Sequence, residues 1–153
     1  AWSDFTLVMG VSREEYNLIE NRINSIIVTY FSPSKNIKEF EDILLNSSIL
    51  GIGQKVKLLS NMDCFDLKYV DKIRRFSSIR NGIAHCNASP HVNANVAPDG
   101  KITYADSKNI IKVMNSSGQI KEKELEMEYD EFAKLEHEIT PYLDNYLLEL
   151  KSK

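Results

Sequence analysis

Asp66–Ser89, with the sequence DLKYVDKIRRFSSIRNGIAHCNAS, is the segment from which the rest of this chain is best interpreted. Its apolar residues recur three, four or seven positions apart, which is typical of a helix with one buried face. The sequence Asn87-Ala88-Ser89-Pro90 is expected to end that helix. The apolar residues that we expect to face inward are Val70, Ile73, Phe76 or Ser77, and Ile83.

Three further helices are predicted before this segment. Ser12-Arg13-Glu14-Glu15 has the pattern of a capping box and predicts a helix start, followed by apolar residues at helical spacing as far as Tyr30. Pro33 is expected to end this first helix. A second helix is predicted over 36–45 and a third over 48–61, with Gly51-Ile52-Gly53 interpreted as a helix start or a bend rather than a phosphate-binding loop.

The pattern changes to strands and turns between about residues 91 and 128. The sequences Ala97-Pro98-Asp99-Gly100 and Asn115-Ser116-Ser117-Gly118 are typical of turns. Apolar residues alternate with glutamates from Glu124 to Tyr129, as on a strand with one solvated face. The expected strands are 101–104, 110–114 and 125–129.

A last helix is predicted over 130–150, with Pro141 expected to kink or split it. The sequence therefore predicts one mainly α domain over residues 1–153. We expect a bundle of four to five helices, with a small antiparallel β meander inserted at about 91–128, before the last helix.

Composition limits the classes of function. The chain is 42% hydrophobic and 27% charged, and its net charge is −3. Any nucleic-acid binding must therefore come from a local basic patch rather than from the whole surface. Cys64 and Cys86 are too few for a disulfide framework and are interpreted as reduced thiols. No membrane span and no signal peptide are recognised, so we expect a cytoplasmic protein.

The helix expected from Asp66 carries a cluster of basic residues. Lys72, Arg74 and Arg75 lie in it, and its local net charge is about +3 when Lys68, Arg80 and the two aspartates are counted. This is the best candidate for a phosphate-binding surface, to which Lys55 could add. The alternative is a solvated helix face that forms ordinary ion pairs with a neighbouring helix.

Arg80-Asn81-Gly82-Ile83-Ala84-His85 ends this helix and combines three useful side chains. Arg80 can bind a phosphate with two parallel hydrogen bonds. A histidine such as His85 can take up or release a proton during catalysis, and Asn81 can donate a hydrogen bond. Because RNA carries its own nucleophile, the 2′-hydroxyl, these groups could cleave a phosphodiester without a metal or cofactor. The alternative is that Asn81 and His85 only brace the bundle.

Helical geometry adds a constraint on this motif. Asn81 and His85 are four residues apart and share a face, whereas Arg80 and His85 lie about 140° apart around the axis. Either the helix loosens near Ser89-Pro90, or a second subunit supplies the missing group.

A stripe of small residues, Ser78, Gly82 and Cys86, suggests where a second subunit could dock. The three lie four residues apart and would let another backbone come close, so a two-fold dimer is expected across this face. Packing within the chain is the alternative.

Other candidates receive simpler interpretations. His91 is placed in a loop and His137 on a solvated helix face. A zinc site from His85, Cys86 and His91 lacks a fourth ligand at useful spacing, so no metal site is predicted. The acidic run Glu122–Glu131 is interpreted as the solvated face of a strand, or as a surface that binds a basic partner or shields an RNA groove.

Ile79-Arg80-Asn81-Gly82-Ile83-Ala84-His85 resembles the signature of the HEPN superfamily, in which four to six residues separate an arginine from a histidine. The gap here is four, a polar residue follows the arginine, and Ile83-Ala84 is similar to the apolar and small pair of many members. The order of helices also resembles the all-helical HEPN bundle over about 110 residues. The strand-rich segment 91–128 departs from it and resembles an insertion.

The resemblance implies a metal-independent endoribonuclease that acts as a homodimer in toxin–antitoxin or antiviral defence. In that case Arg80 stabilises the phosphate, His85 is the general acid and base, and Asn81 orients the substrate or the histidine. Other HEPN proteins are regulators or interaction modules, so an antitoxin or regulatory protein is a further possible partner beside RNA.

Overall fold

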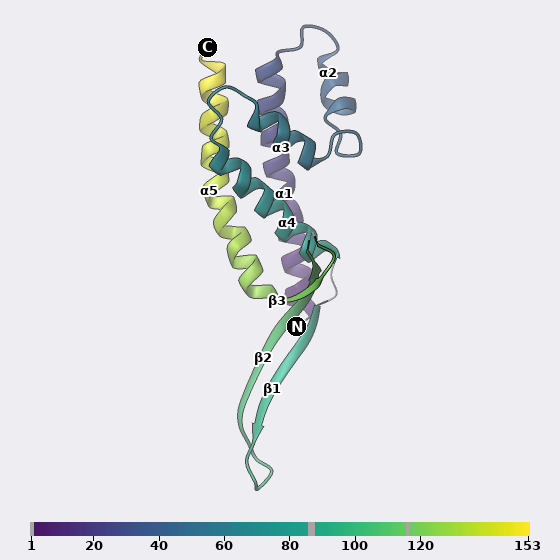
Figure 1. The fold of residues 1–153 in the computed structure, drawn as a ribbon, viewed down its shortest axis with the longest axis vertical. Coiled ribbons are helices and arrows are strands. Elements are labelled where there is room, and N and C mark those ends of the chain that lie inside the picture. Colours follow the sequence, from purple (N-terminus) through teal and green to yellow (C-terminus); the bar gives the residue numbers. More distant parts are fainter. Residues whose placement is uncertain (1, 86–87, 116) are drawn as a thin grey trace.

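The computed structural model describes residues 2–85, 88–115 and 117–153 and is mainly helical, as expected (Figure 1). Within these ranges it has five α-helices, one π-helical segment and a three-stranded antiparallel sheet before the last helix. The long helices α1, Trp2–Phe31, and α5, Leu125–Lys151, pack along each other, and α4, Leu67–His85, packs on both. No described helix is long and apolar enough to cross a membrane.

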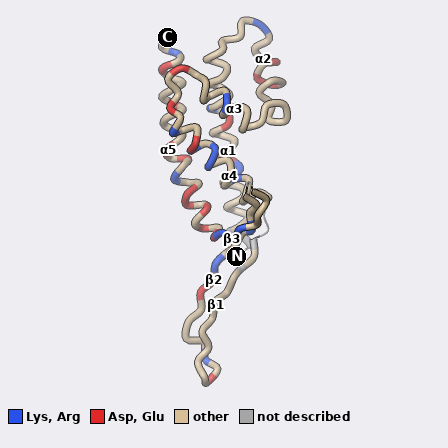
Figure 2. The backbone as a smooth tube through the Cα atoms, in the orientation of Figure 1, with Lys and Arg blue, Asp and Glu red and all other residues tan. Residues whose placement is uncertain are grey.

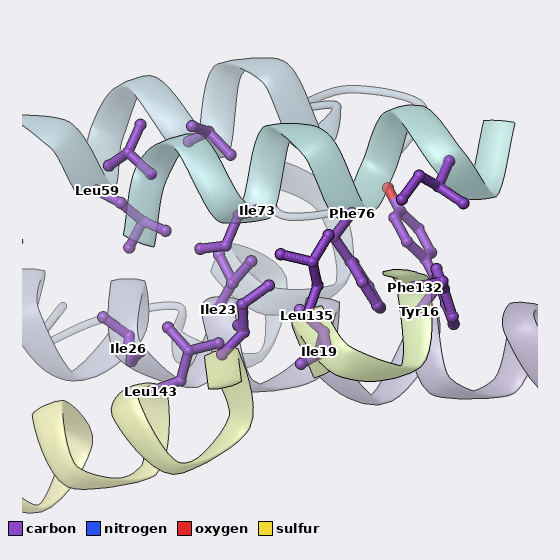
Figure 3. Packing of buried hydrophobic residues seen from close by; sticks show 14 of the residues in the cluster. Tyr16, Ile19, Ile23, Ile26, Leu59, Ile73, Phe76, Phe132, Leu135 and Leu143 are labelled. Carbon is purple, nitrogen blue, oxygen red and sulfur yellow. The ribbon is translucent and has the colours of Figure 1, made fainter. Parts of the chain in front are cut away.

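The hydrophobic core lies between these three helices (Figure 3). Ile23 of α1 and Ile139 of α5 are completely buried. Phe76 of α4 stacks on Phe132 of α5 with ring centroids 4.2 Å apart, and Tyr16 of α1 also stacks with Phe76, with ring centroids 6.1 Å apart. The apolar face predicted for α4 is confirmed, because Val70, Ile73, Phe76, Ser77 and Ile83 are all buried.

The first helix begins ten residues earlier than the predicted capping box. Ser12 lies inside α1, is buried, and donates its hydroxyl to the Met9 carbonyl at 3.1 Å. The capping-box prediction is therefore wrong. The physical reason is that Phe5, Val8 and Met9 continue the helical spacing upstream and pack against the core, which favours helix there regardless of a capping sequence.

The segments between α1 and α4 are short. α2, Ile37–Glu39, continues into a π-helical turn, η1, over Phe40–Leu44. α3, Ile52–Ser60, begins after the extended residue Gly51, which confirms the interpretation of the two glycines as a helix start but places that start four residues later than predicted.

A small three-stranded antiparallel sheet is present before the last helix, as predicted, but its strands differ from the predicted ones. β1, Ala88–Val96, pairs with β2, Ile102–Met114, which pairs with β3, Ile120–Glu124. The predicted strands 101–104, from Ile102 on, and 110–114 are parts of the single strand β2, and β3 was not predicted. Gly100 and Gly118 adopt φ angles of +82° and +81°, and each donates its amide to a carbonyl three residues back. The first turn is thereby confirmed, and so is the second in its described residues; Ser116 lies outside them. β1 was not predicted, and His91 lies in it rather than in a loop.

Leu125–Tyr129 is the start of α5 and not a strand. Leu125, Glu128 and Phe132 are buried at helical spacing against the bundle, whereas Met127 is 66% exposed. A short alternating sequence is compatible with the two-residue period of a strand and with the 3.6-residue period of a helix. Here burial against α1 and α4 favours the helix. The helix also continues through Pro141 without a break, so the predicted split is absent.

The β1–β2 hairpin extends beyond the helices as an arm (Figure 1). β3 pairs with β2 only at 110–114, so among the described residues the distal part of the hairpin consists of β1 and β2 alone. Strand β1 carries no lysine, arginine, aspartate or glutamate, and the arm is largely uncharged in Figure 2.

Candidate functional site

Asn81 and His85 are both exposed on the last two turns of α4. They line one open groove of about 750 Å³ between α4 and strands β2 and β3. Its lining includes one carboxylate, Glu128, and three cations, Arg75, Lys121 and Lys123. Lys112 also borders the groove, but it is paired in register with Glu122, on the opposite face of the sheet from Lys121 and Lys123. A groove with this excess of cations suits an anionic ligand.

Arg80 lies on a different side of α4. It lines a smaller pocket of about 230 Å³ beside α1, together with Ser12, Arg13 and Ala84. Its guanidinium lies 4.8 Å from the ring centroid of Tyr16, a cation–π arrangement. The helix is regular through His85, so Arg80 and His85 line separate pockets, as their spacing predicts.

Arg80 is nevertheless connected to the first groove through Asn81. Its Nη1 donates to Asn81 Oδ1 at 3.0 Å, and Asn81 lines that groove beside His85. Arg80 Nε is buried without a partner among the described residues. The guanidinium is thus held by one hydrogen bond and one aromatic ring, while its Nη2 has no hydrogen bond to a described residue.

The small-residue stripe is used, at Gly82, within the chain. A Cβ added to Gly82 would lie 2.9 Å from Val113 Cγ1 of β2. Strand β2 of the same chain therefore makes the close approach to α4 that was expected from a second subunit. At Gly82, packing within the chain, the alternative interpretation, is what the structure has. Ser78 is exposed in the groove, and Cys86 lies outside the described residues.

Two members of the predicted basic cluster are neutralised by α5. Lys72 forms a short ion pair with Glu138. Arg75 donates to Glu131 at 2.8 and 2.7 Å and to Glu128 at 3.2 Å. The hydrogen bond from Arg75 is the main reason that the pKa of Glu131 lies below its usual value. Lys72 and Arg75 therefore form ion pairs with a neighbouring helix, as the alternative interpretation of the basic cluster expects.

Arg74 and Lys55 have very different surroundings. Arg74 is exposed and only loosely paired with Asp71, at 3.6 Å. Lys55 is fully buried, and its ammonium donates to Glu20 at 2.8 Å and to the Leu45 carbonyl at 2.7 Å. Lys55 therefore presents no charge at the surface, and its assignment to a basic groove is wrong.

The sequence interpretation missed the lysines of β3. Lys121 and Lys123 line the groove with His85, but Lys121 lies directly before, and Lys123 within, the run Glu122–Glu131, which is interpreted from the sequence as acidic. A strand's period of two separates them from Glu122 and Glu124, and that alternation was the available signal. Glu128 and Glu131 of the same run are on α5 and contact Arg75.

The remaining histidines lie apart from the groove's lining. His137 is 86% exposed on α5, as predicted, and its Nδ1 lies 3.9 Å from Glu136. His91 is exposed on the arm. No group of three or more histidine, cysteine, aspartate or glutamate side chains able to hold a metal occurs among the described residues.

Comparison with models of protein families, with curated proteins and with solved structures finds no match to this chain. The resemblance to the HEPN superfamily therefore rests on residues 79–85 and on the order of the helices.

Proposed function

We propose that the protein is a metal-independent endoribonuclease of HEPN type, which acts as a dimer on single-stranded or loop RNA in toxin–antitoxin or antiviral defence. One observation carries the proposal: Asn81 and His85 lie side by side in an open groove in which cations outnumber carboxylates. Such a groove would attract a phosphodiester backbone.

The proposed reaction uses the 2′-hydroxyl of the RNA as nucleophile. His85 removes its proton, and the 2′-oxygen forms a bond to the adjacent phosphorus. The bond from phosphorus to the 5′-oxygen breaks, and that oxygen takes up a proton from an acid. The products are a 2′,3′-cyclic phosphate and a 5′-hydroxyl. Asn81 orients the ribose or the histidine, and the arginine stabilises the charge on the phosphorane.

The proposal also requires two chains. Because α4 is regular through His85 and turns Arg80 towards α1, one chain does not bring both groups to one groove. In a dimer, Arg80 of one copy would complete the groove that contains His85 of the other. Arg80 is suited to this because its Nη2 makes no hydrogen bond with the described residues.

The first test is RNA cleavage in EDTA by the wild type and by His85→Ala, Arg80→Ala and Asn81→Ala. We expect cleavage by the wild type and losses of at least about 100-fold in the first two variants. His137→Ala removes an exposed histidine elsewhere and is the matched control, with wild-type activity expected. Equal cleavage by the wild type and His85→Ala, or no cleavage of any RNA by the wild type, would contradict the proposal.

Mixing the two inactive variants tests the composite site. If Arg80 and His85 act across the interface, mixed dimers of Arg80→Ala and His85→Ala contain one intact site. We expect about a quarter of wild-type activity at equal amounts, since half of the dimers are mixed and half of their sites are intact. No recovery in dimers that are shown to exchange subunits would mean that each site lies within one chain.

The arm favours a second candidate, a non-catalytic regulator that acts through protein contacts. Val92, Val96, Ile102 and Tyr104 are each more than half exposed on the distal hairpin, and a two-stranded hairpin alone is only marginally stable in water. An antitoxin or regulatory protein could cover these residues. This candidate predicts that His85→Ala leaves the growth effect of expression intact, whereas Val92→Ser/Val96→Ser abolishes it. A nuclease predicts a histidine-dependent growth arrest.

A further inference from the structure

Strand β3 has two chemically different faces. Its residues alternate between lysine and glutamate from Lys121 to Glu124. Lys121 is paired in register with Val113, and Lys123 with Ile111. Side chains that lie directly opposite each other in an antiparallel pair are on the same face of the sheet. The lysines therefore share the face that carries Ile111 and Val113.

That shared face is turned towards α4. Ile111 is 1% exposed and belongs to the core, and Val113 lies against Gly82. Lys121 and Lys123 accordingly lie along the wall of the groove opposite α4, which contributes Asn81 and His85. Glu122 and Glu124 are on the other face of the sheet. There Glu124 forms an ion pair with Lys108, with 2.7 Å between Glu124 Oε1 and Lys108 Nζ.

The two lysines keep most of their charge available. Lys121 has no ion pair with a described residue. Lys123 lies 3.4 Å from Glu128, but that carboxylate also accepts two hydrogen bonds from Arg75, at 3.2 and 3.4 Å. One carboxylate is thus shared between two cations, and the groove remains positive at neutral pH.

The spacing of the lysines suits a repeating anion. Residues two apart on a strand are separated by about 6.7 Å, which is comparable with the distance between successive phosphates of an extended nucleic-acid strand. A single compact anion would need cations that converge on one point, whereas these lie in a row along β3. We propose that Lys121 and Lys123 bind two successive phosphates of a single-stranded RNA beside His85, so that β3 is the phosphate-binding wall of the groove.

This inference rests on the proposed function for the identity of the ligand, and it gives the strand-rich insertion a role in substrate binding. The test is equilibrium binding of a fluorescently labelled single-stranded RNA, measured by anisotropy at several salt concentrations. All proteins carry His85→Ala so that cleavage does not interfere. Cleavage is measured separately with the same lysine changes in the wild-type background.

Lys121→Ala/Lys123→Ala should weaken binding about tenfold and lower the slope of log affinity against log salt by about 1.4, or 0.7 for each lost phosphate contact. Lys121→Arg/Lys123→Arg should retain both values because the charges remain. Lys108→Ala is the matched control, since it removes the same charge from the opposite face of the same sheet, and should leave affinity nearly unchanged. Single-stranded DNA should lose affinity in parallel, because phosphates are common to both.

The outcomes separate this inference from the nuclease proposal. Suppose that the wild type cleaves RNA but Lys121→Ala/Lys123→Ala changes neither the affinity for RNA nor its salt dependence. Then β3 is not the phosphate-binding wall, and the inference is overturned. An equal loss in Lys108→Ala would also overturn it, because the effect would then be one of general charge. If the wild type does not cleave while the alanine pair lowers affinity and slope as expected, the nuclease proposal fails and the binding wall is upheld.

Discussion

Val113 packs against the backbone of Gly82, so closely that a Cβ on Gly82 would come within 2.9 Å of Val113 Cγ1. This contact seats β2 on α4 and forms the floor of the groove that Asn81 and His85 line. The glycine is needed here for space, since it lies within the last turn of α4, where alanine is intrinsically preferred to glycine.

Gly82→Ala is therefore expected to destabilise the fold, despite a gain of about 1 kcal/mol in helix propensity. A stiff valine has few rotamers with which to avoid the new methyl group, and overpacking costs about 1–3 kcal/mol. In a Val113→Ala background the clash is absent, so the same substitution should become stabilising. Denaturant unfolding of the four proteins of this cycle measures the effect, and an unchanged sign in the Val113→Ala background would contradict the proposed packing.

The buried ion pair of Lys55 and Glu20 leads to a second prediction. Glu20→Ala leaves the buried ammonium with only the Leu45 carbonyl as a partner, and removal of one member of such a pair costs about 3–5 kcal/mol. Lys55→Met removes the buried charge and keeps much of the side-chain volume, so we expect a smaller loss. Chemical denaturation distinguishes the two variants, and a larger loss in Lys55→Met would argue against this account.

Lys55→Met also tests whether Lys55 contributes to RNA binding in the groove. Because the ammonium is fully buried and bound to Glu20, the variant should bind single-stranded RNA like its parent under conditions in which both are folded. A loss of affinity comparable with that of the β3 lysine pair would restore Lys55 to the binding surface.

The sequence predicted the elements whose periodicity is long and unambiguous. α4 was placed within a residue or two at each end because its buried residues Val70, Ile73 and Ile83 keep helical spacing over several turns. Ser12 misled because a capping sequence is local, whereas the helix start depends on upstream residues that reach the core. Leu125–Tyr129 misled because five residues fit two periods equally well, and only contacts with distant helices decide between them.

Only the part of the candidate site that depends on local helical geometry was predicted from the sequence. Asn81 and His85 share a face by local geometry, and they share a groove in the fold. Strand register decides where Lys121 and Lys123 point, and register depends on pairing with β2, a non-local contact. Lys55 could not be assigned correctly from its neighbours in sequence, because its buried ammonium is bound by Glu20 and Leu45, 35 and 10 residues away.

Acid should weaken the contact between α4 and α5. Hydrogen bonding to Arg75 lowers the pKa of Glu131 from its usual 4.5, and the charges of Arg75, Lys123 and Lys134 act in the same direction. A lowered pKa in the folded state means that this stabilisation is present above the unfolded pKa and is lost as pH falls through the folded value. At neutral pH it is worth about 0.2–1 kcal/mol, because the pair is partly exposed.

Glu131→Gln should therefore lower the melting temperature at pH 7 and have a much smaller effect below pH 3. Thermal unfolding of the variant and the wild type across this range measures the difference. Glu14→Gln, at an exposed position on α1, is the control for loss of one carboxylate. A difference that stays constant from pH 7 to pH 3 would show that Glu131 acts through packing rather than through its charge.

The contribution of Glu15 of α1 to stability is expected to depend on pH in the opposite direction to that of Glu131. Its pKa is raised from 4.5, first by burial and then by the charge of Glu136, with His137 opposing the shift. Its Oε2 is buried without a partner among the described residues. Since the folded pKa is the higher one, the contribution of Glu15 is most favourable below the unfolded pKa and is lost as pH rises through the folded value.

Replacement of Glu15 by glutamine keeps the shape and removes the charge. We expect Glu15→Gln to raise the melting temperature by about 1–3 °C at pH 7, because a carboxylate no longer has to be held in a partly buried position near Glu136. At pH 3.5 the wild-type carboxyl is already protonated, so the two proteins should unfold at nearly the same temperature. Glu136→Gln should reproduce part of the gain at pH 7 by removing the neighbouring charge. A destabilised Glu15→Gln at pH 7 would instead mean that the carboxylate makes a favourable contact in the folded chain.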